Sequence, residues 1–232
     1  MQVHILSWNI WMGKYTQKII DLLSREKPDI IALQEVIQDE GGNNNTAEFI
    51  ANALGYHWVF SPVTSFRHEG REVDWGEAVL SRYDIEKSEV LELSTDPRHI
   101  GLLATIKIHE KKLHVVSTHL IHTHQTESVY QQEEARSLIR LVPKNRTVVM
   151  GDFNALPDSK SIAIMRETFN QADPANAPTW CVYPDGCATC KLGAVSKRLD
   201  YIFTTSDLQE SDYHVIQSDG SDHLPIEITL AI

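Results

Sequence analysis

The chain has 232 residues, of which 42% are hydrophobic and 23% are charged, and its formal net charge is −11 at pH 7. This composition is typical of a soluble globular protein, and the acidic balance argues against a protein that binds long nucleic acid over a basic surface, unless a local basic patch outweighs it. No apolar run approaches the roughly 20 residues of a membrane span. The stretch MQVHILSWNI (1–10) lacks the basic start and cleavage site of a signal peptide, so we expect none.

Short stretches typical of β-strands recur along the chain, whose length suits a single domain over residues 1–232. These stretches combine β-branched residues with alternating or continuously apolar patterns. In chain order the predicted strands are 3–10, 29–36, 57–63, 77–81, 102–108, 112–120, 146–153, 198–203, 212–218 and 225–232.

Helical periodicity separates some of these strands. Apolar residues recur on one face in the predicted helices 16–27, 46–55, 127–141 and 158–169. The second helix is expected to begin at the capping-type residue Thr46 and to end at Gly55. Residues 41–45 predict a loop, and 170–197 form a long irregular stretch. Many strands with a few interleaved helices predict a layered architecture, with sheets at the centre and helices outside.

Polar side chains occur at or beside the ends of six predicted strands. They are Asn9, Glu35, His119, Asp152 with Asn154, Asp200, and Asp222 with His223. Each of them alone is more often turn chemistry or a paired core acid. Six segments that all carry polar residues at strand ends are harder to explain in that way, because an unpaired acid buried in an apolar strand destabilises the fold by several kcal/mol. They need one another, a cation, or both.

The stretch TVVMGDFNALPD (147–158) shows the pattern most clearly. An apolar strand runs into Asp152 and Asn154, which point the same way if the chain stays extended. The pair is either ordinary turn chemistry or two oxygen groups aimed at a metal or a phosphate. Hard oxygen ligands suit Mg²⁺ or Mn²⁺, and nearby histidines supply acid–base chemistry near neutral pH. Together these groups indicate metal-assisted hydrolysis of a phosphate ester.

The chain resembles the endonuclease/exonuclease/phosphatase superfamily in a series of motifs that follow the family's order. The matching motifs are LSWNI (6–10), IIALQEV (30–36), GEAVLSRYDI (76–85), VVSTHL (115–120), VVMGDFNALPD (148–158), RLDYIF (198–203) and SDHLPIEI (221–228). The resemblance implies an α+β fold, a four-layer αββα sandwich of two packed mixed β-sheets flanked by helices. It also implies a divalent-metal-dependent phosphoesterase whose site lies at one edge of the sheets.

The resemblance implies a metal site and a set of catalytic residues. Glu35 matches the principal metal-binding glutamate, Asn9 matches the asparagine that orders metal and phosphate, and Asp222 lies near the metal. The expected cofactor is Mg²⁺ or Mn²⁺.

The catalytic roles follow from the same resemblance. Asp152 matches the acid that orients or deprotonates the attacking water, and Asn154 the amide that holds a phosphate oxygen. His223 matches the histidine that contacts the phosphate, with Asp200 hydrogen-bonded to its ring. His119 matches a leaving-group acid or transition-state stabiliser.

The sequence also departs from the family in three places. Trp11 replaces an acid that some abasic-site enzymes carry, and His119 is usually missing from those enzymes. Glu77 replaces a frequent phosphate-side asparagine, so it would repel phosphate unless it binds metal or faces away. The departures at Trp11 and His119 argue against an abasic-site enzyme.

The resemblance leaves the substrate open. Nucleic acid is the broadest expectation, and the alternative is a small or lipid-linked phosphoester of the kind that sphingomyelinases or inositol phosphatases hydrolyse. A family member that binds without catalysis is the third hypothesis, although every matched position keeps a functional residue type. We expect a monomer.

Three cysteines predict no disulfide framework and favour a reducing, cytoplasmic location. Cys181, Cys187 and Cys190 favour a loop with free thiols over a labile disulfide or a zinc site.

Other polar and aromatic residues keep two interpretations each. His122 and His124 are loop residues near the site or part of a second metal site. The basic stretch 191–198 is a solvated loop or holds a substrate phosphate, and Trp75 and Trp180 either pack or stack on a base or sugar.

Overall fold

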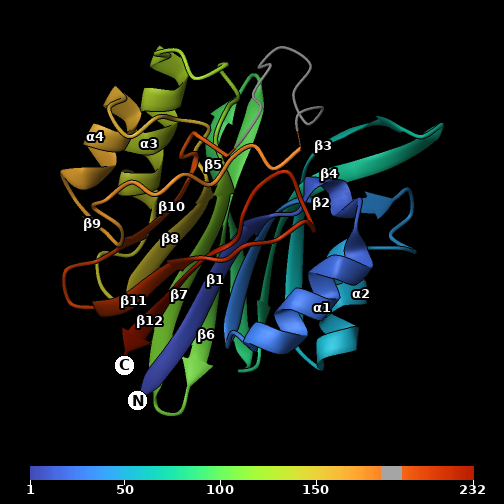
Figure 1. Cartoon of the computed structure of the whole chain (residues 1–232), viewed down its shortest axis with the longest axis horizontal. Helices are drawn as coiled ribbons and strands as arrows, with labels where there is room; N and C mark the ends of the chain where they lie inside the picture. The colour runs from blue at the N-terminus through green and yellow to red at the C-terminus, as the bar shows by residue number, and fades with distance from the viewer. Residues whose placement is uncertain (184–194) are drawn as a thin grey trace.

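The computed structural model describes residues 1–183 and 195–232. Within this part of the chain, two six-stranded β-sheets pack face to face, and helices cover their outer faces (Figure 1). The predicted αββα sandwich is therefore confirmed. None of the helices in the described ranges has the length and apolar character needed to cross a membrane.

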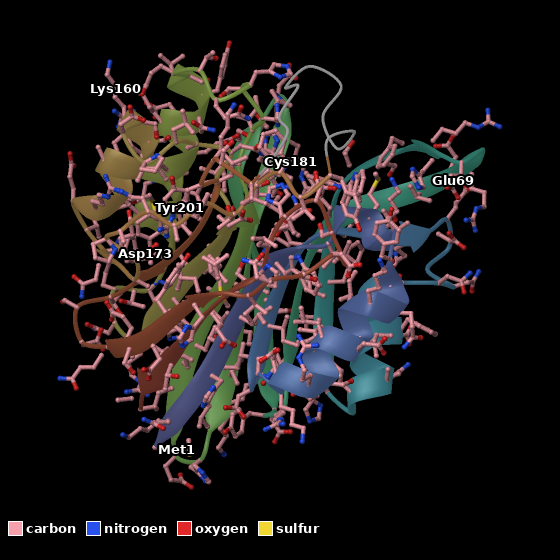
Figure 2. All side chains as sticks on the ribbon, viewed as in Figure 1. Met1, Glu69, Lys160, Asp173, Cys181 and Tyr201 are labelled. Atoms are coloured by element: carbon pink, nitrogen blue, oxygen red, sulfur yellow. The ribbon has the colours of Figure 1, made fainter. Side chains whose placement is uncertain are left out.

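The first sheet has the strand order β11–β12–β1–β2–β4–β3. Only β1 and β2 are parallel neighbours, and the other pairs are antiparallel. Its strands are β1 (Gln2–Asn9), β2 (Ile30–Asp39), β3 (His57–His68), β4 (Arg71–Ser81), β11 (Gln209–Val215) and β12 (Ile226–Ala231). The β3–β4 hairpin is longer than predicted, and its turn at Glu69 projects beyond the sheet (Figure 2).

The second sheet has the order β5–β6–β7–β8–β10–β9, with β7 and β8 as its parallel pair. Its strands are β5 (Ile85–Thr95), β6 (Arg98–Ile108), β7 (Lys111–His119), β8 (Thr147–Asp152), β9 (Asn170–Gln171) and β10 (Asp200–Thr204). Strand β5 is missing from the predicted set. It is an edge strand in which Leu91 and Leu93 are buried while most of its other residues are exposed, so its apolar pattern is weak.

The helices divide between the two outer faces, as Figure 1 shows. The first sheet is covered by η1 (Trp11–Gly13), α1 (Thr16–Glu26) and α2 (Thr46–Leu54), and the second by α3 (Val129–Leu141) and α4 (Lys160–Arg166). The predicted cap of α2 is wrong by one residue, because the Asn45 side chain accepts the backbone N–H groups of Ala47 and Glu48. Helix α4 is shorter than predicted and is capped by Ser159.

Alternate residues of the central strands face the space between the sheets. From the Met1 end (Figure 2), this space is filled by buried apolar side chains, among them Ile5, Val79, Val115 and Val148. Toward the opposite end, the same strands place polar residues between the sheets. These are Ser7 and Asn9 on β1, Gln34 on β2, Glu77 on β4, Ser117 and His119 on β7, Asp152 on β8 and Asp200 on β10. The functional residues therefore gather where the core becomes polar.

The cysteine-containing stretch 181–190 and the basic stretch 191–198 lie only partly within the described residues. Cys181 is buried and its thiol donates to the carbonyl of Tyr183, while Cys187 and Cys190 lie outside the described residues. Of the basic stretch 191–198, residues 191–194 are also outside. Arg198 is neither solvated nor available to a substrate, because it is buried in an ion pair with Asp173, with Nη1 at 2.6 Å from Oδ2.

Candidate active site

A pocket of about 390 Å³ opens at the polar end of the space between the sheets. Most of the predicted site residues line it, namely Glu35, His119, Asp152, Asn154, Asp222 and His223. Asn9 and Asp200 lie directly behind its wall and hydrogen-bond to residues that line it. All eight predicted side chains therefore come together, and both sheets contribute to the site.

Glu35 reaches the pocket because β2 is irregular at this point. The pairing of β2 with β4 shifts register between Leu33 and Val36, which marks a β-bulge, and Glu35 within it has φ 56°. Regular alternation would direct Gln34 between the sheets and the next residue toward the helices. The bulge turns Glu35 into the pocket wall instead. A positive φ costs a residue other than glycine about 1–3 kcal/mol, and such strain is common at functional sites.

The tip of β8 is a turn and not an extended strand. The strand ends at Asp152, and Asn154 has φ 49°, with its backbone N–H donating to Asp152 Oδ1 at 2.8 Å. The expectation that the two side chains share a direction because the chain is extended is therefore wrong. Gly151 allows β8 to approach β7 closely here, because a Cβ at this position would lie 1.8 Å from the carbonyl oxygen of Thr118.

Asn154 holds His119 and leaves no amide hydrogen for a substrate. Its Nδ2 donates to the carbonyl of Leu120 at 3.0 Å and lies 2.8 Å from His119 Nε2. The carbonyl fixes the orientation of the amide, so Nε2 accepts the second hydrogen and His119 carries its proton on Nδ1. In this arrangement Asn154 is a positioning residue for His119. The implied contact between Asn154 and a phosphate oxygen would require it to give up one of these bonds.

Asn9 links two carboxylates that come from different sheets. Its Nδ2 lies 3.1 Å from Glu35 Oε1 and 3.1 Å from Asp152 Oδ2, so both of its amide hydrogens are used. Its Oδ1 accepts the backbone N–H of Trp11 at 3.1 Å, which fixes the orientation of the amide. Asn9 therefore sets the distance between Glu35 and Asp152 across the space between the sheets.

His223 is held by a buried carboxylate. Its Nδ1 lies 2.9 Å from Asp200 Oδ2, and the same oxygen accepts the hydroxyl of Thr179 at 2.6 Å. The carbonyl of His223 accepts the indole N–H of Trp8 at 2.9 Å, which fixes the backbone. On the pocket side, His223 Nε2 lies 3.5 Å from Asp152 Oδ2. The predicted orientation of His223 by Asp200 is present in the structure.

Two of the pocket histidines, His119 and His223, have opposite protonation preferences. Burial alone would lower the pKa of His223, but the carboxylates of Asp200 and Asp152 outweigh it and raise the pKa well above its ordinary value. Burial, followed by the charge of His223, lowers the pKa of His119 well below its ordinary value. Near neutral pH, His223 is a cation and His119 is neutral. His119 is therefore poorly suited to act as a leaving-group acid.

The fold and the site have known relatives. A model of the endonuclease/exonuclease/phosphatase family matches residues 6–223. The chain belongs to this family. Its members are phosphoesterases that generally depend on a divalent metal.

Solved structures of family members share the whole fold. An endonuclease/exonuclease/phosphatase from Beutenbergia cavernae is 21% identical, with a TM-score of 0.81 over 100% of this chain and 72% of that one. The mannosyl-6-phosphatase Bt3783 of Bacteroides thetaiotaomicron is 17% identical, with a TM-score of 0.76 over 99% of this chain and 100% of that one. The human Nocturnin catalytic domain with bound sulfate is 19% identical, with a TM-score of 0.72 over 99% and 94%. At these identities the likeness establishes the fold alone.

The acids of the pocket suit a hard cation of the kind that the family uses. Burial and the neighbouring charge of Asp222 raise the pKa of Glu35 to about 7, which is the effect expected when carboxylates face each other without a cation between them. The donors are oxygen atoms, which Mg²⁺ and Mn²⁺ prefer. Glu35 and Asp222 would hold the cation, and Asn9 would keep Glu35 in place.

A second group of possible ligands has a different explanation. Asp152, Asp200 and His223 place one ligand atom each within 4.8 Å of one another, as a metal site would. Both ring nitrogens of His223 face carboxylates, however, at 2.9 Å from Asp200 Oδ2 and 3.5 Å from Asp152 Oδ2, as two hydrogen-bond donors would. A protonated nitrogen has no lone pair for a metal. We therefore interpret this group as a hydrogen-bonded relay and not as the metal site.

Several pocket residues escaped the sequence analysis or stayed ambiguous. His99 and Met12 line the pocket and lacked any sequence signal. Trp75 and Trp180 also line it. Trp180 is buried and donates its indole N–H to Asp222 Oδ2 at 3.2 Å, so it positions that acid. Trp75 packs beside His119, with ring centroids 5.1 Å apart.

Glu77, which replaces the frequent asparagine of the family, faces away from the pocket. Glu77 is fully buried between the sheets and accepts the hydroxyl of Ser117 at 2.6 Å. Burial raises its pKa to about 8, so Glu77 is neutral at pH 7. It therefore does not repel a phosphate in the pocket. His122 lies at the pocket wall beside His124, with Nε2 at 3.2 Å from Nδ1, which agrees with the position near the site that was expected for these loop residues.

Proposed function

We propose that the protein is a divalent-metal-dependent phosphoesterase that hydrolyses a phosphodiester or phosphomonoester bond. The observation that carries this proposal is the position of a cationic His223 beside Asp152 in a pocket that Glu35 and Asp222 also line. His223 favours a negatively charged group in the pocket, and the acids favour a cation. A phosphate ester with a bound metal satisfies both preferences.

The protonation states of Asp152 and His223 assign them different catalytic roles. Burial raises the pKa of Asp152 to about 7 against the opposing charge of His223, so Asp152 is basic enough to accept a proton from the attacking water. The water oxygen bonds to phosphorus as its proton passes to Asp152, and the ester P–O bond breaks, with the leaving oxygen keeping the electron pair and taking a proton from solvent. His223 donates a hydrogen bond to a phosphate oxygen, and Asp200 keeps the ring oriented and charged. When bound, the divalent cation supplies a Lewis acid that neutralises charge on the phosphate.

The pocket lining favours a small phosphoester over a long nucleic acid. Among the described residues, no lysine or arginine lines the pocket, and the whole chain carries a formal net charge of −11. A nuclease that follows a polynucleotide backbone needs several cationic contacts. Nucleic acid, the broadest expectation from the resemblance, is therefore the second candidate substrate. The monomeric state and the cytoplasmic location stay predictions.

The test is hydrolysis of bis(4-nitrophenyl) phosphate and 4-nitrophenyl phosphate with Mg²⁺ or Mn²⁺ and with a chelator. We expect turnover only with the metal, and we expect Glu35→Gln to lose about 100-fold or more in activity at fixed metal concentration. Glu48→Gln is the matched control, because Glu48 is a half-buried acid on α2 that does not line this pocket. Turnover that is unchanged by chelation, or a Glu35→Gln variant as active as the control, would contradict the proposal.

A further inference from the structure

A second pair of an acid and a histidine lies at the pocket, separate from Asp200 and His223. His99, at the start of β6, lines the pocket, and its Nδ1 lies 2.9 Å from Oε1 of Glu134 on α3. Glu134 is only 1% exposed. The pair has the same construction as Asp200 and His223, in which a buried carboxylate also lies 2.9 Å from a ring nitrogen.

Glu134 is held so that its carboxylate faces His99. The hydroxyl of Ser94 donates to Oε1 at 3.0 Å, and the backbone N–H of Ile121 donates to Oε2 at 2.9 Å. In the described part of the chain, the ion-pair partner of Glu134 is His99, with no lysine or arginine in reach. A buried carboxylate is costly unless several donors satisfy it. The arrangement therefore fixes the ring of His99 and directs its second nitrogen, Nε2, away from Glu134.

His99 Nε2 and the Trp75 ring remain available on the pocket side. Neither ring nitrogen, Nε2 of His99 nor Nε1 of Trp75, has a hydrogen-bond partner within residues 1–183 and 195–232, and neither is a buried unsatisfied atom. Trp75 and His99 both lie close to His119, on the β4 and β6 side of the pocket. The chemistry of phosphate binding proposed above uses neither residue.

The chemistry of these two side chains indicates the group that they would bind. An imidazole nitrogen accepts a hydrogen bond when the ring is neutral and donates one when it is charged, and a hydroxyl group can satisfy either form. The face of an indole ring packs against a flat or cyclic group. The absence of lysine and arginine from the described pocket lining argues against a second phosphate at this position.

We propose that His99 and Trp75 form a subsite for the alcohol portion of the phosphoester, and that this portion is a sugar ring. Glu134 is the positioning residue of this subsite. The inference rests on the proposed phosphoesterase function, since the phosphate would lie at His223 while the sugar lies against Trp75. The sugar belongs either to a hexose phosphate or to a nucleotide.

The experiment compares a sugar phosphate with an aryl phosphate that has no hydroxyl group. Glucose 6-phosphate, adenosine 5′-monophosphate and 4-nitrophenyl phosphate are hydrolysed by the wild-type protein and by His99→Ala. We expect kcat/KM of His99→Ala to fall roughly 10- to 100-fold for the preferred sugar phosphate and less than about 3-fold for the aryl phosphate. The preferred substrate shows whether the sugar is a hexose or a ribose.

Further variants separate binding from a purely structural role. Glu134→Gln is expected to raise KM for the sugar phosphate more than for the aryl phosphate, whereas a loss of packing would affect both substrates equally. His99→Gln should recover part of the loss, since its amide can also hydrogen-bond to a hydroxyl. Trp75→Phe should keep more activity than Trp75→Ala. The matched control is His4→Ala, because His4 is an exposed histidine near the start of β1, at the end of the strand away from the pocket.

Calorimetry distinguishes failure of the subsite from failure of the proposed function. If no phosphoester is hydrolysed with metal, but glucose 6-phosphate or adenosine 5′-monophosphate binds the wild-type protein and not His99→Ala, the subsite stands and the hydrolase proposal fails. If turnover is metal-dependent and His99→Ala changes the sugar and aryl substrates equally, or neither of them, the subsite is overturned. Equal binding of both sugar phosphates to the wild-type protein and to His99→Ala overturns it as well.

Discussion

The two ends of the space between the sheets are built by the same strands and have opposite chemistry. Near the Met1 end, β1, β7 and β8 contribute Ile5, Val115 and Val148 to an apolar core. At the other end, β1 and β8 contribute Asn9 and Asp152 to a pocket of buried acids and amides. The comparison teaches that position along a strand, and not the strand itself, decides whether a side chain supports the fold or the chemistry.

A layer of neutral polar residues separates the two ends. The Gln34 amide donates to Ser117 Oγ at 3.0 Å, and Ser117 donates to Glu77 at 2.6 Å, all of them buried. The acids of the pocket, in contrast, act on one another and on two histidines. We call the pocket end of this space the open end and the apolar Met1 end the closed end. Changes at the open end should therefore act mainly on catalysis, and changes at the closed end mainly on stability.

His223→Ala should give the largest effect and should act on the open end alone. It removes the charged donor to the phosphate, so we expect kcat to fall about 1,000-fold or more. The free energy of unfolding should also fall, by about 3 kcal/mol, because the change leaves the buried Asp200 carboxylate without its cation. Steady-state kinetics with thermal melting check both statements. Turnover within about 10-fold of the wild-type value would contradict the role of His223.

Ile106→Ala is the matched change in the apolar core. Ile106 is fully buried in the cluster between the sheets, so its truncation should lower the free energy of unfolding by about 2–4 kcal/mol. Urea unfolding measures this loss. Turnover per folded molecule should stay within about 2-fold of the wild-type value at low temperature. A specific loss of kcat in a folded Ile106→Ala protein would mean that the two ends are coupled.

Asp200→Asn tests the origin of the charge on His223. Burial opposes that charge and the Asp200 carboxylate supports it, so Asn should lower the pKa of His223. We expect kcat to fall about 100-fold at pH 7. The activity should also disappear at a lower pH than in the wild-type protein, because an imidazole with a lower pKa loses its proton earlier as the pH rises. An unshifted alkaline limb in the pH profile would reject this explanation.

Glu77→Gln probes the layer between the two ends. Burial raises the pKa of Glu77 to about 8 from an ordinary value of 4.5, so the native state holds this proton while the unfolded state releases it. The contribution of Glu77 to stability therefore decreases as the pH rises from about 4.5 to 8, whereas Gln contributes no such slope. From pH 6 to pH 8.5, the stability of the variant relative to the wild-type protein should rise by about 2 kcal/mol. Parallel pH–stability curves from urea unfolding would show that Glu77 is not a buried neutral acid.

Divalent metal should give the smallest effect, and one that depends on pH. Because the pKa of Glu35 is raised to about 7 without a cation, Glu35 is largely protonated at pH 6 and ionised at pH 8. Millimolar Mg²⁺ should therefore stabilise the protein about 1 kcal/mol more at pH 8 than at pH 6. Melting curves with and without metal measure this difference. Glu35→Gln should abolish it, and an equal shift at both pH values would place the metal elsewhere.

The sequence predicted the strongly patterned strands and the identity of the site residues, but not the weakly patterned strand or the local backbone of the site. Strands with strong β-branched patterns, such as β7 and β8, were predicted to within two residues, whereas the weakly apolar edge strand β5 was not. Asn154 and Glu35 were selected correctly as pocket residues, but the turn and the bulge that orient them depend on pairing with neighbouring strands.

Residue pattern alone predicted layered sheets with acids, amides and histidines at strand ends, and the resemblance to the family implied that these groups meet at one edge of an αββα sandwich. Tertiary structure alone decided their protonation. His119 and His223 are the same residue type, yet the buried carboxylates of Asp200 and Asp152 raise the pKa of His223, whereas burial and the charge of His223 lower the pKa of His119. The pairing of His99 with Glu134 also spans 35 positions in the sequence and forms only when α3 packs on the second sheet. A pKa depends on burial and on nearby charges, and folding creates both.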